Sequence, residues 1–294
     1  MGRVTRKHKV LRLGRDLASP RTDTLAVEEP LEVRLNGDAF VVTMRTPGDD
    51  IDLIHGLLHS ETVIESRHDV VTARYCDGVG PDGLNTYNVV DVTLAVGIAP
   101  PDPGLRRNVL TTSACGVCGT TTIDQVVRGS RYPLDAQVRI SQDVILSGPI
   151  RLREQQRAFD KTGGLHAAGL MTVHGEMLCV REDVGRHNAV DKVVGWAIRE
   201  HRLPLSKTIL CVSGRASFEL TQKAVLAGIP MLVAVSAPSS LAVELAEEAG
   251  LTLVGFVRGD TMNVYTQPQR VVPSTPSTSE PGWEPSITQL APRA

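Results

Sequence analysis

The sequence predicts an α/β protein in which a sheet covered by helices follows a smaller α+β domain. Two observations lead to this expectation. Residues 151–266 alternate between apolar strand-like runs and helical patterns, whereas residues 21–150 begin with strand and hairpin patterns. In addition, 294 residues exceed what one compact domain usually holds, so two globular parts plus tails are expected.

The smaller domain, residues 21–150, is expected to open with a β-hairpin. Its first two strand-like runs meet at Asn36-Gly37, a pair that favours a tight two-residue turn. A segment with apolar residues at helical spacing follows Thr46-Pro47-Gly48-Asp49-Asp50, and two more strand-like runs come after it. The expected strands are 31–35, 40–44, 70–75 and 88–96, and the expected helix is 51–58.

The larger domain, residues 151–266, alternates more regularly between strands and helices. Such alternation is typical of a mostly parallel sheet with helices packed on its faces. The expected strands are 169–173, 177–181, 208–212, 231–236 and 252–257, and the expected helices are 185–200, 217–227 and 239–249.

Both ends of the chain are expected to lie outside the two domains. Residues 1–20 are rich in Arg and Lys and are expected to form a flexible basic arm. Residues 267–294 repeat Pro among Ser and Thr, a composition that buries too little apolar surface to fold. We therefore expect a disordered, passive tail there.

Composition limits the possible functions. The net charge of −2 provides no basic field, so neither nucleic acid nor a membrane surface is an expected partner. Hydrophobic residues make up 41% and aromatic residues only 3%, which predicts aliphatic cores. The start of the chain lacks the apolar stretch of a secretory signal, no run is long enough to span a bilayer, and the five cysteines are an odd number. These features favour a cytoplasmic protein with reduced thiols.

The run Thr111 to Thr120 contains the most informative motif, Cys115-Gly116-Val117-Cys118. Such a pair can be half of a zinc site, a redox pair, or a nucleophile with a helper. Zinc is weakly supported because the other cysteines, Cys76, Cys179 and Cys211, are scattered, and no metal ligand set is assigned. A thioredoxin-like pair should open a helix directly after a strand, whereas glycines flank this one. An exposed thiol just before a helix has its thiolate stabilised by free N–H groups, which suits a persulfide carrier. A glycine-rich turn with incidental cysteines is the plainer alternative.

Three further segments carry more polar residues than packing requires. They are Arg181 to Lys192 around a helix start, Ser213 to Glu219 where a strand passes into a helix, and Ser236 to Ser240 at a similar junction. Ligands commonly bind at such strand ends, where free helix N–H groups and arginines hold phosphates. The plainer readings are a salt-bridged helix face for the first and an N-cap role of Ser217 for the second. Together with the segment after the last strand, the candidate binding residues are Arg186, His187, Lys192, Ser213, Gly214, Arg215, Phe256, Val257, Arg258, Gly259, Asp260 and Thr261.

On these residues the sequence resembles the formate dehydrogenase accessory sulfurtransferase family, FdhD. The resemblance covers nearly all of residues 27–266. The segments that carry it are 46–50, 115–119, 162–168, 181–192, 213–219, 236–239 and 256–265. So many matches in order make chance agreement improbable, unlike a cysteine pair alone.

The resemblance implies a sulfurtransferase that accepts persulfide sulfur from a cysteine desulfurase on Cys115, with Cys118 as an assisting residue. It implies delivery of that sulfur to a molybdenum (or tungsten) bis-molybdopterin guanine dinucleotide cofactor before its insertion into formate dehydrogenase. Residues 256–261 match the segment that binds the guanine nucleotide. The resemblance further implies homodimers and a second domain of the cytidine deaminase type, a mixed sheet flanked by helices.

One departure bears on the chemistry. A zinc deaminase needs His-x-Glu and a later Pro-Cys-x-x-Cys, but His166 precedes two alanines and no Pro-Cys-x-x-Cys run occurs. Deaminase activity is therefore not expected. Two rival functions remain at this point: a cofactor-binding chaperone without sulfur chemistry, and a protein that binds zinc through the cysteine pair across a dimer.

Overall fold

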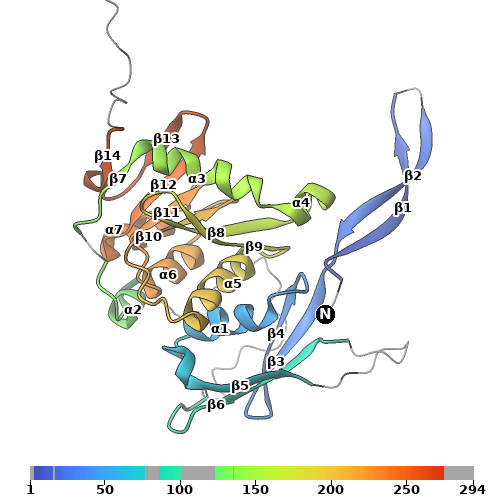
Figure 1. Cartoon of the computed structure of the whole chain (residues 1–294), viewed down its shortest axis with the longest axis horizontal. Coiled ribbons are helices and arrows are strands. Elements are labelled where there is room, and N and C mark those ends of the chain that lie inside the picture. The colour runs from blue at the N-terminus through green and yellow to red at the C-terminus, as the bar shows by residue number, and fades with distance from the viewer. Residues whose placement is uncertain are drawn as a thin grey trace, which may run out of the picture.

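A six-stranded mixed sheet forms the centre of the molecule, with the strand order β13-β12-β11-β10-β8-β9 (Figure 1). The structure is a computed structural model that describes residues 3–15, 17–76, 78, 86–100, 123–134 and 136–274. The strands of the sheet are β8 (His166–Thr172), β9 (Met177–Asp183), β10 (Thr208–Val212), β11 (Met231–Ala234), β12 (Thr252–Arg258) and β13 (Thr261–Val264).

Only β10, β11 and β12 are parallel to one another, and the other three strands pair antiparallel. The expectation of a mostly parallel sheet was therefore wrong, whereas the mixed sheet flanked by helices is confirmed. The reason is local. Gly175, at φ 91°, closes a short turn between β8 and β9, and a turn this short joins only antiparallel strands.

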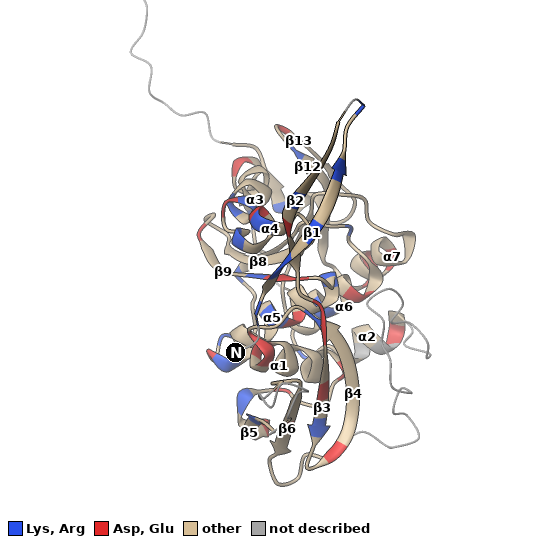
Figure 2. Cartoon of the chain, turned by 90° about the vertical axis from the view of Figure 1, so that its right-hand side faces the viewer, with Lys and Arg blue, Asp and Glu red and all other residues tan. Residues whose placement is uncertain are grey.

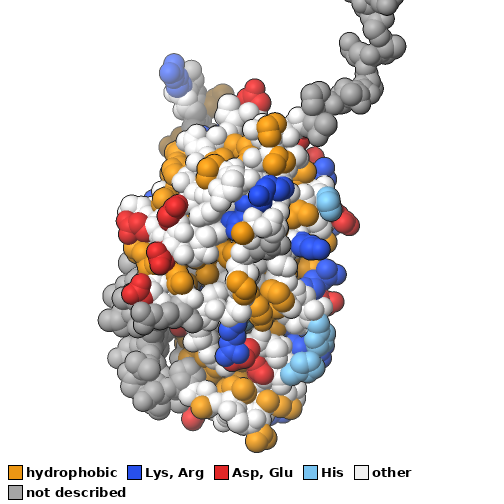
Figure 3. Space-filling model, turned by 90° about the vertical axis from the view of Figure 1, so that its left-hand side faces the viewer, with side chains coloured by type: hydrophobic (Ala, Val, Ile, Leu, Met, Phe, Trp, Pro, Cys, Tyr) orange, Lys and Arg blue, Asp and Glu red, His pale blue; other side chains and the backbone are white. Residues whose placement is uncertain are grey.

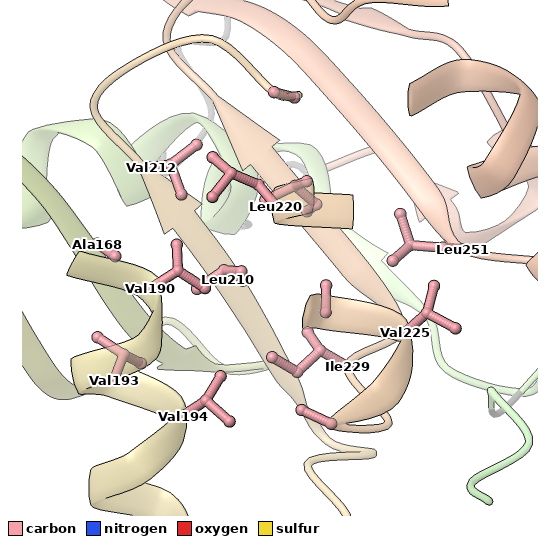
Figure 4. Close-up of a cluster of buried hydrophobic side chains, with 14 of the residues drawn as sticks. Ala168, Val190, Val193, Val194, Leu210, Val212, Leu220, Val225, Ile229 and Leu251 are labelled. Carbon is pink, nitrogen blue, oxygen red and sulfur yellow. The ribbon is translucent and has the colours of Figure 1, made fainter. Parts of the chain in front are cut away.

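Helices cover both faces of this sheet. On one face lie α2 (Ile123–Gly129), α5 (Arg186–Arg199), α6 (Phe218–Leu226) and α7 (Ser240–Ala249), and on the other lie α3 (Gln142–Glu154) and, beyond it, α4 (Arg157–Thr162) (Figure 1). Strand β10 shows the consequence, because Leu210 and Val212 point into the core under α5 and α6 (Figure 4), whereas Ile209 and Cys211 belong to the core under α3. Burial on both faces explains why these strands read as continuous apolar runs.

The N-terminal part is a four-stranded sheet, in the order β4-β3-β6-β5, that packs on helix α1. The predicted hairpin is present, and Asn36 and Gly37 have φ values of 53° and 91°, as its tight turn requires. A 3₁₀ turn, Arg67–Asp69, precedes β5. The elements are β3 (Glu29–Leu35), β4 (Asp38–Arg45), α1 (Asp50–Ser60), β5 (Val70–Tyr75) and β6 (Val89–Leu94).

Helices α1 and α5 join the two parts of the molecule at very short range. A Cβ on Gly56 would lie 2.0 Å from the carbonyl oxygen of Asp191, and one on Gly195 would lie 1.8 Å from that of Asp52. Only glycine at both positions lets the two backbones approach so closely. We call this contact, with the charged residues around it, the α1–α5 joint.

An antiparallel hairpin of β1 (Thr5–Leu13) and β2 (Ala18–Ala26) stands away from the body and carries several Lys and Arg residues (Figure 2). The expectation of a flexible arm over residues 1–20 was wrong, because Thr5–Leu13 pairs with Ala18–Ala26. The hairpin buries almost no side chain, since Leu11 and Leu13 remain 62% and 72% exposed. The hairpin is held by hydrogen bonds between the backbones of its two strands. Such bonds require no regular pattern of apolar residues, so the sequence gives no signal for them.

Two domain limits also differ from those expected. The boundary after residue 150 falls inside α3, which packs on the large sheet and belongs to the second part. The expected start of the tail at residue 267 is wrong, because Pro268–Arg270 form a 3₁₀ turn and β14 (Val271–Val272) pairs with β7 (Ile140–Ser141). Residues 275–294 lie outside the described residues. None of the helices in the described part of the chain is both long and apolar enough to cross a membrane.

Candidate functional site

A cleft of about 1060 Å³ opens at the carboxyl ends of β10, β11 and β12, where β8 begins. Helices α3 and α4 form its opposite wall. This edge of an α/β sheet is the usual place for ligands. The cleft is lined by Leu146, Pro149, Ile150, Leu152, Arg153, Glu154, Gln156, Phe159, Asp160, Gly163, Gly164, Leu165, His166, Ser213, Val235, Val257, Arg258 and Gly259.

Four of the predicted binding residues meet in this cleft: Ser213, Val257, Arg258 and Gly259. Ser213 is held in place by its neighbour on β8, because its hydroxyl accepts a hydrogen bond from the Ala167 N–H (2.9 Å) and its own N–H donates to the Ala167 carbonyl (3.0 Å). The Nε of Arg258 donates to the Val235 carbonyl (3.2 Å). That single bond occupies one of five guanidinium protons, so the exposed group can still hold an anion.

A β-bulge sets the shape of the segment 256–261. The pairing of β12 with β13 shifts between Gly255 and Arg258, and Phe256 adopts a left-handed φ of 52°. Phe256 is 40% exposed as a result, whereas Val257 faces the core. Asp260 and Thr261 lie at the exposed turn into β13 and do not line the cleft. Of the predicted segment 256–261, therefore, only Val257, Arg258 and Gly259 line the cleft.

Helix α5 begins next to the cleft with Arg186 and His187. The Nε of Arg186 is buried and has no hydrogen-bond partner among the described residues. The Nε2 of His187 lies 3.1 Å from Glu219 Oε2 and 3.3 Å from the Ser217 hydroxyl, which ties α5 to α6. This contact lowers the pKa of Glu219 to about 2. Ser217 occupies the N-cap position of α6, as the plainer reading expects, but its side chain makes no capping hydrogen bond with that helix.

Two other candidates from these segments lie away from the cleft. Arg215 is exposed ahead of α6, and Gly214 lies against the His166 ring, where a Cβ would be 3.5 Å from Nδ1. Neither of the two lines the cleft. Gly214 can still affect the site through that ring.

Lys192 has a structural role instead of the predicted phosphate contact. Its side chain is 1% exposed, and its Nζ lies 2.8 Å from Asp183 Oδ2 and donates to the Thr46 carbonyl at 2.9 Å. Asp183 in turn accepts the N–H groups of Thr46 and Gly185. The charged segment 181–192 thus mostly joins the two parts of the molecule, which corrects the prediction for Lys192.

His166 lies in the cleft but is not among the binding residues predicted from the sequence. It begins β8 and lines the cleft beside Ser213. Burial, then the positive charges of Arg186 and His187, lower its pKa below the usual value for histidine. The sequence feature that could have identified His166 is its position in the segment 162–168, one of those that carry the family resemblance.

The cysteine pair Cys115 and Cys118 lies outside the described residues. Cys179 and Cys211 are buried in the cores, as predicted for packing residues, and burial raises the pKa of each thiol to about 12. Within the part of the chain that the structure describes, no three His, Cys, Asp or Glu residues are grouped as a metal site. On the face shown in Figure 3, charged side chains of both signs are mixed with apolar ones, and the described residues form no continuous basic surface there.

Several known proteins that share one name are similar to this chain over most of its length. A protein of Nocardia farcinica named Sulfur carrier protein FdhD is 60% identical over 271 residues, which cover 92% of this chain and 96% of that protein. Proteins of the same name from Streptomyces coelicolor and Mycobacterium tuberculosis are 58% and 53% identical, each over 92% of this chain and 97% and 100% of their own.

A solved structure shares the fold. The crystal structure of a putative formate dehydrogenase accessory protein from Desulfotalea psychrophila superposes with a TM-score of 0.71 at 21% identity, over 92% of this chain and all of that one. The sequence model described as the FdhD/NarQ family matches residues 26–272, which include the joint and the cleft. The chain therefore belongs to the FdhD/NarQ family.

Proposed function

We propose that this protein is a sulfur carrier that takes persulfide sulfur onto Cys115 and delivers it to the molybdenum cofactor of formate dehydrogenase. The observation that carries this proposal is its identity of 60% with a protein named a sulfur carrier, over 92% of the chain. The solved structure of similar fold, named as a putative formate dehydrogenase accessory protein, agrees with that target.

The first step is a thiol–persulfide exchange with a cysteine desulfurase in the cytoplasm. The Cys115 thiolate attacks the outer sulfur of the donor's persulfide, a new S–S bond forms on Cys115, and the donor cysteine leaves as a thiolate. The step needs an accessible, ionised thiol, which the buried Cys179 and Cys211 do not offer because their pKa is raised to about 12. Of the other three cysteines, Cys76 stands alone, whereas Cys115 and Cys118 form a Cys-x-x-Cys pair.

In the second step the S–S bond of the Cys115 persulfide breaks and its outer sulfur bonds to the metal of a bound substrate, the molybdenum or tungsten bis-molybdopterin guanine dinucleotide. The outer sulfur takes two electrons from the reduced metal to become a sulfide ligand, and Cys115 leaves as a thiolate. We assign a guanine nucleotide of this substrate to the cleft between the strand ends and α3–α4. Its volume of about 1060 Å³ is at the upper end of the usual range for ligand pockets. Arg258 and Arg153 supply positive charge there. A homodimer is part of the proposal and is carried by the family resemblance alone.

Mass spectrometry of the intact protein tests the first step. After incubation with a cysteine desulfurase and cysteine, the wild type should gain the mass of one sulfur, and so should Cys118→Ala. Cys115→Ala should gain none. If Cys115→Ala is sulfurated while Cys118→Ala is not, the assignment of the carrier is wrong.

The same variants separate the sulfur carrier from a chaperone that only binds the cofactor. We expect a chain with both cysteines changed to alanine to leave formate dehydrogenase inactive in cells that lack the native protein. Restored formate dehydrogenase activity in those cells would favour the chaperone. Metal analysis of the purified protein tests the third possibility, zinc held by the pair.

A further inference from the structure

His166 lies where a ligand in the cleft would meet it. It begins β8, and the two hydrogen bonds between Ala167 and Ser213 hold this strand end against the end of β10. Its ring faces Gly214, where a Cβ would lie 3.5 Å from Nδ1 and 3.7 Å from Cε1. Neither ring nitrogen hydrogen-bonds a residue in the described part of the chain. The ring is thus partly buried, lines a cleft and keeps both nitrogens available.

The charges around His166 leave a positive excess. The charged and titratable groups near it are Asp183 from β9, Arg186 and His187 from α5, Arg258 from β12, and Arg153, Glu154 and Asp160 from α3 and α4.

Most of these groups already have a partner. Asp183 pairs with Lys192, His187 with Glu219, and Arg153 with Asp160. Arg186 has a buried Nε without a partner, and Arg258 uses one bond to a carbonyl. Among the described groups, the two cations Arg186 and Arg258 therefore outnumber the one carboxylate without a cation, Glu154, and the remaining positive charge suits an anion.

Resting on the proposed function, we infer that His166 contacts an anionic group of the bound nucleotide, a phosphate, and takes up a proton when that group binds. The positive charge of Arg186 disfavours the imidazolium in the free protein. A phosphate in front of the ring reverses this balance, because an opposite charge within a few ångströms stabilises the protonated form. His166 is therefore a positioning residue whose protonation state changes when the nucleotide phosphates bind.

The coupling of nucleotide binding to protonation of His166 sets how the nucleotide affinity changes with pH. If the pKa of His166 is higher in the complex than in the free protein, affinity is constant above the pKa of the complex. It rises as pH falls between the two values, and it becomes constant again below the pKa of the free protein. Nucleotide binding near pH 6.5 should therefore take up protons.

The probe is GDP, and the protein is the full chain. Titration calorimetry in buffers of different ionisation enthalpy measures both the affinity and the protons taken up. We expect His166→Gln to bind GDP about tenfold more weakly, in line with the loss of one hydrogen bond to a charged group, and to lose most of the proton uptake. His174→Gln, at the exposed turn between β8 and β9, is the matched control and should behave as the wild type.

Nuclear magnetic resonance gives a second measurement that uses the unaltered chain. The Cε1–H signal of His166, assigned by its loss in His166→Gln, should titrate at a higher pH with GDP than without it. In Arg186→Met without GDP the same signal should also titrate at a higher pH than in the wild type. A His166 that does not contact the nucleotide would show the shift in Arg186→Met but no shift on addition of GDP.

The outcomes separate this inference from the function on which it rests. Wild-type affinity and proton uptake in His166→Gln, or an unchanged His166 titration on GDP binding, would overturn the role of His166 alone. A wild-type chain that does not bind GDP would remove both the nucleotide cleft and this inference. Sulfur transfer to Cys115 is tested independently, because the mass measurement does not involve the cleft.

Discussion

The α1–α5 joint and the cleft are built from the same kinds of residue, yet they use charge in opposite ways. In the joint, Asp52 receives hydrogen bonds from Arg181 (2.9 Å) and Arg199 (2.5 Å), and Lys223 donates to Asp191 (2.7 Å). Lys192 and Asp183 complete the same pattern. In the cleft, by contrast, Arg258 and the His166 ring retain unused capacity for hydrogen bonds among the described residues, and beside the cleft so does the buried Nε of Arg186.

This difference shows what distinguishes a structural charge from one that binds a ligand. A buried charge is stable only when it is paired and hydrogen-bonded within the protein, so its partners are already present. A ligand-binding charge must keep part of its capacity for the ligand. Lys192 and Arg186 lie in one short charged segment, and only their partners assign them to different classes.

Removing one charge from the joint should have the largest effect on stability. Lys192→Met leaves the Asp183 carboxylate buried without its cation, and we expect a loss of about 3–5 kcal/mol in the free energy of unfolding. Urea denaturation measures it. Arg258→Met is the matched change in the cleft and should alter stability by less than about 0.5 kcal/mol while weakening GDP binding. Equal losses of stability in the two variants would remove the distinction between joint and cleft.

Widening the joint should cost somewhat less. In Gly195→Ala the new Cβ would lie 1.8 Å from the Asp52 carbonyl oxygen, so α1 and α5 must move apart and lose contacts around the glycines. We expect a loss of about 3 kcal/mol, the upper end for overpacking. Gly129→Ala serves as the control, because a Cβ there meets nothing within 4 Å. A Gly195→Ala chain as stable as this control would mean that the helices are not in close contact.

The pH dependence of stability gives the smallest of these effects. His59 lies near Lys223, and burial, followed by the charges of Lys223 and Arg131, lowers its pKa to about 4. The unfolded chain therefore binds a proton near pH 6.5 while the folded chain does not, so stability falls as pH decreases from 6.5 towards 4. The expected loss between pH 7 and pH 5 is about 2 kcal/mol.

His59→Gln should make the free energy of unfolding less dependent on pH over that range. His174→Gln, which changes an exposed histidine, should retain the wild-type dependence. Urea denaturation at a series of pH values measures both variants. If His59→Gln keeps the full wild-type slope, the buried neutral histidine of the joint is not its source.

The sequence by itself determined the elements whose side chains are buried on a regular pattern. The predicted strands 70–75 and 208–212 coincide with β5 and β10, and the predicted helix 185–200 differs from α5 by one residue at each end. All five residues of β10 are buried and read as a continuous apolar run, and α5 carries apolar residues at helical spacing, so both patterns are visible in one dimension. The family was also recognised from residue order alone.

Only the tertiary structure decided features that depend on partners distant in the chain. The hairpin of β1 and β2 is held by backbone hydrogen bonds and buries no regular set of side chains, and Pro149 inside α3 obscured a helix that packs on the far face of the sheet. The separation of Lys192 from Arg186, and the place of His166 in the cleft, follow from contacts with Asp183, Thr46 and Ser213. The residue type alone does not tell a structural charge from a ligand-binding one. The role of a charged side chain depends on whether its partner is a residue of the protein or a ligand.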